Sequence, residues 1–258
     1  MRRSHAVQLL VLSVVVAATI GVYNWPQLTT TIELRLAYRN DAEMWRTPVP
    51  LPDTSISNIA RRKTSCQGYE FELPWEDVAA QKDVPLKQLH MTTTAITFVS
   101  GDSMSFSTND FMSPTLAGLL TQLGSLHSED AERLVSTFDF RREVLEATPA
   151  QIDPFLSRRE MIRVSTLLAM KLASPPSSDG LYEFQTKDFR GFQFEKRESR
   201  AIDIVDQLFG PDGTVTISFF ERAPGWAPTL TQPEINRVLQ SIHKIPTLPP
   251  APTKESRP

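Results

Sequence analysis

Residues 181–245 decide the fold, and they read LYEFQTKDFRGFQFEKRESRAIDIVDQLFGPDGTVTISFFERAPGWAPTLTQPEINRVLQSIHKI. Apolar and polar side chains alternate in residues 192–194 (FQF), 202–204 (IDI) and 215–219 (VTISF). Alternation with a period of two places one row of side chains on a core and the other row toward water. The stretch as a whole predicts four short strands, three of which contain these segments, followed by a helix.

A turn and a helix cap punctuate this stretch. Pro211, Asp212 and Gly213 stand between the last two strand segments, and Gly213 can adopt the positive φ that a tight turn requires. Residues 231–234 (TQPE) form a capping box at the start of the helix, and Pro246 ends it. We expect this helix to pack on the sheet face of Val215, Ile217 and Phe219 through its apolar side, which consists of Ile235, Val238, Leu239 and Ile242.

The preceding residues add further strands and several helices. Residues 68–75 alternate and end near Pro74, while residues 95–100 and 104–107 form two strands joined at Gly101-Asp102. Capping residues and apolar periodicity then predict helices in residues 113–124, 128–145, 148–154 and 157–172. The sequence thus predicts an α+β fold, an antiparallel β-sheet covered by helices, over residues 67–245.

An uncharged apolar run occupies residues 6–23, after Arg2 and Arg3. As a helix it would span roughly 27 Å, enough for a bilayer core. It is either a signal anchor or a signal peptide cut near residues 16–18 (VAA), and its continuation past that point favours the anchor. Positive residues in the short tail place the tail in the cytoplasm and the body outside. We expect a single-pass protein of the cell membrane, or a secreted protein if the segment is cleaved.

Four parts follow from these observations: an N-terminal transmembrane or signal helix (1–25), a linker (26–66), the α+β domain (67–245) and a proline-rich tail (246–258). The linker contains Pro48, Pro50 and Pro52, which disfavour a regular helix or a central strand. The tail is expected to be disordered or extended.

The net charge of −3 gives no basic field for nucleic acid. The single cysteine, Cys66, excludes an intramolecular disulfide and a cage of several cysteines around a metal. Cys66 is either a buried inert thiol or the site of an intermolecular disulfide. The four histidines lack the spacing of a zinc helix, and glycine-rich phosphate loops are missing from the sequence. No metal or cofactor is therefore predicted.

One string looks catalytic. Residues 100–103 (SGDS) resemble the first block of the GDSL hydrolases, in which Ser103 would be the nucleophile. A nucleophilic serine needs a base and a group that orients the base, and that family supplies both in an Asp-x-x-His sequence. Here residues 240–242 (QSI) precede His243, so the aspartate is missing. A hairpin turn explains the string better, and a serine hydrolase stays the alternative function.

Without an enzyme signature, Trp75 and Trp226 are the candidate contact residues. Each lies at the end of a predicted element beside proline or charged residues, where binding residues are often found. The competing interpretation is that each tryptophan fills the rim of the core.

The order of elements resembles the PsbP/Mog1-type α-β-α sandwich, which includes the LpqN-like exported proteins of bacteria. The resemblance covers about residues 67–245 and is carried by residues 68–74 (GYEFELP), 216–219 (TISF) and 234–242 (EINRVLQSI). It implies a binding or assembly protein rather than an enzyme. We therefore expect a membrane-anchored extracytoplasmic binding or scaffolding module with a protein partner.

Overall fold

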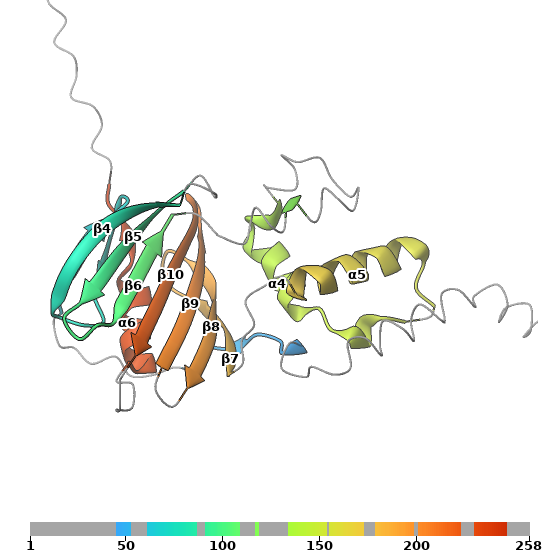
Figure 1. Cartoon of the computed structure of the whole chain (residues 1–258). Helices are drawn as coiled ribbons and strands as arrows, with labels where there is room; N and C mark the ends of the chain where they lie inside the picture. Colours follow the sequence, from blue (N-terminus) through green and yellow to red (C-terminus); the bar gives the residue numbers. More distant parts are fainter. Residues whose placement is uncertain are drawn as a thin grey trace, which may run out of the picture.

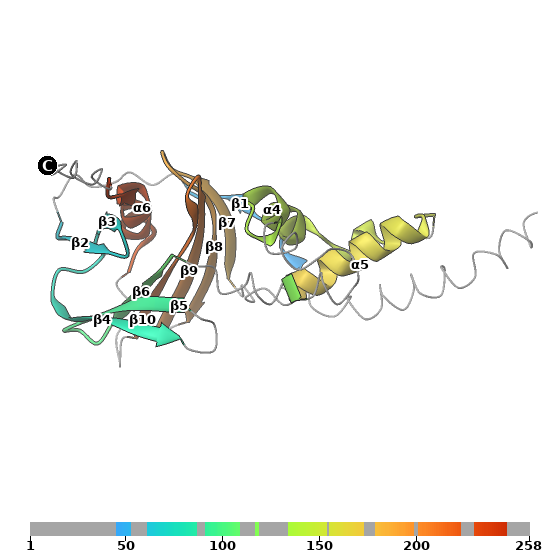
Figure 2. The ribbon, with the colours of Figure 1, turned by 90° about the horizontal axis from the view of Figure 1, so that it is seen from above.

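The computed structural model describes residues 45–52, 61–86, 91–108, 117–118, 134–153, 155–172, 179–198, 201–222 and 230–246. Within them, a large curved sheet separates α6 and a small sheet on one side from α4 and α5 on the other (Figures 1 and 2). The predicted α+β class, with an antiparallel-rich sheet and covering helices, is confirmed.

The large sheet has the strand order β1-β7-β8-β9-β10-β6-β5-β4 in the described part of the chain. All neighbours are antiparallel except β1 and β7. Its strands are β1 (Val49–Pro50), β4 (Val78–Leu86), β5 (Met91–Phe98), β6 (Ser103–Ser107), β7 (Gly180–Gln185), β8 (Arg190–Glu198), β9 (Ala201–Gly210) and β10 (Gly213–Arg222). The small sheet has the order β11-β3-β2 and comprises β2 (Lys63–Cys66), β3 (Tyr69–Glu72) and β11 (His243–Lys244).

The four strands and the helix predicted for residues 181–245 are β7 to β10 and α6 (Gln232–Ser241). Gly213 follows the turn between β9 and β10 with φ +127°, a conformation that L side chains rarely adopt. The capping box at Thr231 and Glu234 is present at the start of α6. Alternation and turn chemistry were therefore sufficient to predict this part of the fold.

The face of the sheet below α6 contains the main core. Its buried members include the predicted pairing of Ile235, Val238, Leu239 and Ile242 with Val215, Ile217 and Phe219. Simple alternation predicted that the opposite face of the sheet would be exposed to water, but part of that face is buried. Phe192 stacks on Phe138 of α4 (Phe138–Glu146), with ring centroids 4.8 Å apart. The sheet is buried on both faces where α4 lies.

α4, η3 (Pro149–Gln151) and α5 (Arg158–Leu172) make a helical lobe with its own core. The helix predicted over residues 128–145 is interrupted, because Thr137 is the N-cap of α4. Its hydroxyl accepts a hydrogen bond from the Phe140 N–H. Lys171 of α5 is buried and donates to the carbonyls of Leu145 and Ala147 at the end of α4 (2.5 and 2.8 Å). Only residues 117–118 are described of the helix predicted at 113–124.

The folded body includes residues that the sequence analysis placed in the linker. Residues 63–66 form β2 against β3, and residues 49–50 form β1 against β7. β4 was also not predicted. Its residues are mostly exposed, as expected for a strand at the sheet edge, where Pro85 is tolerated.

The predicted membrane or signal segment and the proline-rich tail beyond residue 246 lie outside the described residues. None of the helices that the structure describes has the length and apolar character that a membrane span needs.

Candidate functional site

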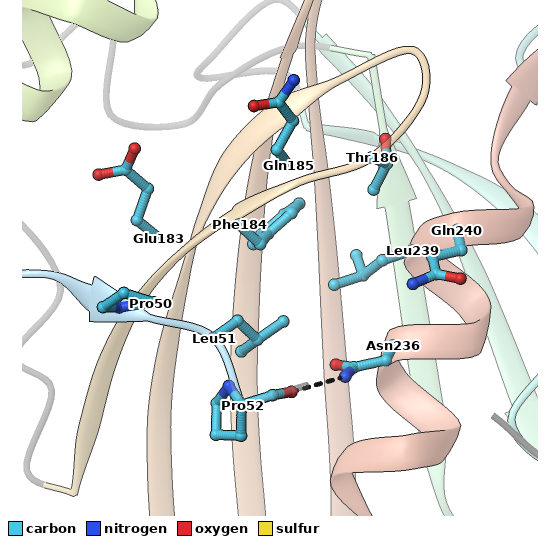
Figure 3. Close-up of a pocket in the computed structure, with 10 residues that line it drawn as sticks. All are labelled: Pro50, Leu51, Pro52, Glu183, Phe184, Gln185, Thr186, Asn236, Leu239 and Gln240. Atoms are coloured by element: carbon cyan, nitrogen blue, oxygen red, sulfur yellow. Dashed lines mark hydrogen bonds between the residues drawn. The ribbon is translucent and has the colours of Figure 1, made fainter. Parts of the chain in front are cut away.

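A pocket of about 280 Å³ opens between β7 and α6 (Figure 3). Three segments that are distant in the sequence form it: the end of β1, the end of β7 and the outer side of α6. Its lining residues are Pro50, Leu51, Pro52, Glu183, Phe184, Gln185, Thr186, Asn236, Leu239 and Gln240.

The pocket exists because the chain leaves the sheet edge after β1. β1 pairs with β7 for two residues, and the Leu51 N–H then donates to the Glu183 carbonyl at 2.8 Å. Pro52 turns toward α6, where the Asn236 Nδ2 donates to its carbonyl at 3.2 Å. Figure 3 shows Pro52 and Gln185 on opposite sides of the resulting wedge.

The floor of the wedge is apolar. Phe184 and Leu239 are buried, and Leu51 packs against the same core. Phe184 lies against Gly191, its partner on β8, and a Cβ added at Gly191 would lie 2.4 Å from the Gln207 carbonyl oxygen. Because Gly191 has no side chain, the Phe184 ring can lie against it and form the floor of the pocket.

The rim is polar and almost uncharged. It carries the side chains of Thr186, Asn236 and Gln240, while the Gln185 side chain points away from Phe184 and Leu239 (Figure 3). Of the lining residues that the structure describes, only Glu183 is ionisable, and its carboxylate lies 3.3 Å from the Arg142 Nε. An apolar floor with a few hydrogen-bonding groups at the rim is the usual composition of a ligand-binding pocket.

A chain of side-chain amides leads from the pocket into the core. The Gln232 Nε2 donates to the Asn236 Oδ1 at 2.8 Å. Gln232 and Gln193 also exchange two hydrogen bonds of 3.0 Å, one in each direction. This chain connects the first turn of α6 to β8 and fixes the wall of the pocket that Asn236 provides.

Asp206 is a buried carboxylic acid beside this amide chain. It lies opposite Gln193 in the ladder between β8 and β9 and is fully buried. Neither of its carboxylate oxygens has a hydrogen-bond partner among the described residues. Burial raises the pKa of the Asp206 carboxyl well above its ordinary value, so the neutral acid is favoured.

A second pocket of about 480 Å³ lies at the turns between β7 and β8 and between β9 and β10. It contains both signs of charge, and its Lys244 Nζ lies 3.1 Å from the Asp212 carboxylate. The lining residues are Tyr69, Lys187, Asp188, Phe189, Pro211, Asp212, His243 and Lys244.

Trp75, one of the two tryptophans proposed as contact residues, is not among the residues that line these pockets. Trp75 is half-buried, and its ring packs on Phe98 with centroids 4.8 Å apart. Trp226 lies outside the described residues. The pocket residues were missed because no local motif marks them, and only the tertiary fold brings the three segments together.

Ser103 lies at the start of β6, paired with Thr97 and Phe220. His243, the one histidine in the described part of the chain, contacts the Ser241 carbonyl through Nδ1 (2.9 Å) and Glu70 through Nε2 (3.6 Å). The structure therefore does not bring this imidazole to Ser103. The described residues also contain no cluster of three or more His, Cys, Asp or Glu side chains able to hold a metal ion.

Comparison with family models, with curated proteins and with solved structures gave no match. The resemblance to the PsbP/Mog1-type sandwich therefore stays a prediction.

Proposed function

We propose that this protein is a membrane-anchored extracytoplasmic binding or scaffolding module. The observation that carries the proposal is the pocket between β7 and α6, with its apolar floor and its rim of neutral amides. Side-chain amides donate and accept hydrogen bonds without titrating, so they suit recognition better than proton transfer.

The residues around the pocket also favour binding over catalysis. General acid–base or nucleophilic chemistry needs a nucleophile within hydrogen-bond reach of a base. The described lining residues include one hydroxyl, that of Thr186, and one carboxylate, that of Glu183, which is paired with Arg142. The resemblance to a fold class of mostly binding and assembly proteins supports the same proposal.

The location rests on the apolar run in residues 6–23 and the preceding arginines. In this proposal the run anchors the protein and the folded body stands outside the cytoplasm. If a peptidase removes the run, the same body is secreted.

Two experiments test the proposal. Reporter domains fused to the C-terminus decide the side of the membrane, and activity of a reporter that works only in the cytoplasm would contradict it. Affinity capture of the full chain from detergent-solubilised membranes tests binding, with each captured protein then purified and rebound. The full chain is used because a body starting at residue 67 would lack β1 and β2.

A fluorophosphonate probe separates the proposal from a hydrolase. We expect no labelling of the full chain. Labelling that disappears in Ser103→Ala would show a reactive serine and would overturn the non-enzymatic interpretation.

A further inference from the structure

We infer that the pocket between β7 and α6 binds an extended peptide segment of a partner protein, which lies beside β7 as an additional strand. The inference rests on the proposed binding function and specifies its ligand. In this mode of recognition, backbone hydrogen bonds supply affinity and a side-chain pocket supplies specificity.

The backbone of Gln185 has the orientation that strand addition requires. Gln185 is paired with Arg190, and the next pair is joined by a hydrogen bond from the Thr186 N–H to the Phe189 carbonyl at 2.8 Å. Since hydrogen-bonded and non-hydrogen-bonded pairs alternate in antiparallel sheets, the N–H and C=O of Gln185 point away from β8. They point to the outer edge of β7, on the side of the pocket.

The protein itself already uses this edge for strand pairing. Two residues before Gln185, the Glu183 carbonyl accepts a hydrogen bond from Leu51. The pairing then stops, because Pro52 turns toward α6 and is held there by Asn236. A peptide strand beside Gln185 would extend the edge pairing that β1 begins.

The pocket below this edge is suited to one apolar side chain of the peptide. Successive side chains of a strand point in opposite directions, so one would enter the pocket and its neighbours would point to solvent. The entering side chain would meet Leu51, Phe184 and Leu239. Gln240 on α6 is exposed and can donate to and accept from the peptide backbone, whereas the Asn236 amide already bonds Pro52 and Gln232.

The charges around the pocket restrict the peptide. Among the described lining residues, only Glu183 has an ionisable side chain, and it is paired with Arg142. A peptide carboxylate at this position would meet no free cation among the lining residues. The favoured segment is therefore apolar at the entering position and uncharged beside it.

The test uses the full-length chain in detergent and a phage-displayed library of random short peptides as the probe. Gln185→Pro removes the outward N–H without removing a hydrogen bond to β8, because proline is tolerated at sheet edges. Gln185→Ala is the matched control, since it keeps the N–H and loses only an exposed side chain that points away from the pocket floor (Figure 3). Gln240→Trp places a bulky ring at the pocket rim.

We expect enriched peptides to bind the wild type and Gln185→Ala alike. They should bind Gln185→Pro about tenfold more weakly, as the loss of one or two hydrogen bonds predicts. Gln240→Trp should weaken binding as well, because its ring obstructs the pocket rim. Hydrogen exchange provides a readout without any substitution. The Gln185 amide should exchange more slowly when an enriched peptide is bound.

Two results would overturn the inference. Peptides that bind all variants equally and leave the Gln185 amide unprotected would place the binding site elsewhere, while the proposed binding function would stand. If no peptide were enriched more on this protein than on an unrelated detergent-solubilised membrane protein, peptide recognition would be excluded. The binding function itself would then be tested separately by the capture experiment.

Discussion

Asp206 lies directly opposite Gln193 between β8 and β9, and both side chains are fully buried beneath α6. Gln193 exchanges two hydrogen bonds with Gln232, whereas the Asp206 carboxylate has no hydrogen-bond partner among the described residues. A buried polar group without such a partner destabilises the folded state. This carboxylate, unpartnered within the described part of the chain, makes Asp206 the first residue to test.

We predict that Asp206→Asn stabilises the protein at neutral pH. Burial raises the folded-state pKa of this carboxyl above its unfolded value. Its contribution to stability is therefore fully present below the unfolded pKa of about 3.9 and is lost as the pH rises through the folded pKa. Asparagine has nearly the same shape and does not ionise, so the gain at pH 7 should be of the order of 1–3 kcal/mol.

Urea unfolding between pH 3 and pH 8 measures this difference. The advantage of Asp206→Asn should shrink toward low pH and vanish near the pKa of an unfolded aspartate. The control is Asp77→Asn, because the Asp77 side chain is exposed. A difference that stays constant across the pH range would contradict the burial argument.

Gly191→Ala should destabilise the fold and disturb the pocket floor. The added Cβ would lie 2.4 Å from both the Gln207 carbonyl oxygen and the Phe184 Cζ. Because the carbonyl belongs to the neighbouring strand, either β8 or β9 must shift. We expect a loss of about 1–3 kcal/mol, the usual cost of overpacking, measured by thermal unfolding.

The control for this prediction is Gly118→Ala, since Gly118 is helical and a Cβ there meets none of the described residues within 4 Å. It should leave the melting temperature unchanged or raise it slightly, because alanine favours a helix more than glycine does. Equal melting temperatures for Gly191→Ala and the wild type would show that the strands yield without cost.

Cys66 should behave as an inert thiol. It is buried, and burial raises its pKa to about 12, although a hydrogen bond with Thr94 acts in the opposite direction. The reactive form of cysteine is the thiolate, which is scarce at pH 8 when the pKa is so high. Iodoacetamide at pH 8 should therefore leave the native protein unmodified and should alkylate Cys66 once urea unfolds it, as mass spectrometry would show.

This placement favours the inert thiol over the intermolecular disulfide, the two alternatives that the sequence left open. A dimer on a non-reducing gel that disappears with reductant and in Cys66→Ser would reverse that choice.

The part of the fold that the sequence predicted is the part in which pairing partners follow one another in the chain. β7 to β10 are successive hairpins, and alternation with the turn at Gly213 was enough to predict them. β1 and β2 were missed because a strand of two residues that includes a proline and a strand of four mostly polar residues show no alternation, and their partners decide their conformation. The pocket was missed for the same reason, since Leu51, Phe184 and Leu239 meet only in the folded chain.

The last prediction concerns α6, where the sequence-based expectation of a packed helix is confirmed. Leu239 is buried in the same core as Phe219 and also contributes to the pocket floor. Leu239→Ala should cost about 2–5 kcal/mol, which corresponds to a fall of at least about 4 °C in the melting temperature for a chain of this size. Gln240→Ala changes an exposed neighbour and should have little effect on stability. If both variants melted like the wild type, α6 would be loosely attached to the sheet in solution, and the wall that it gives to the pocket would not be a fixed one.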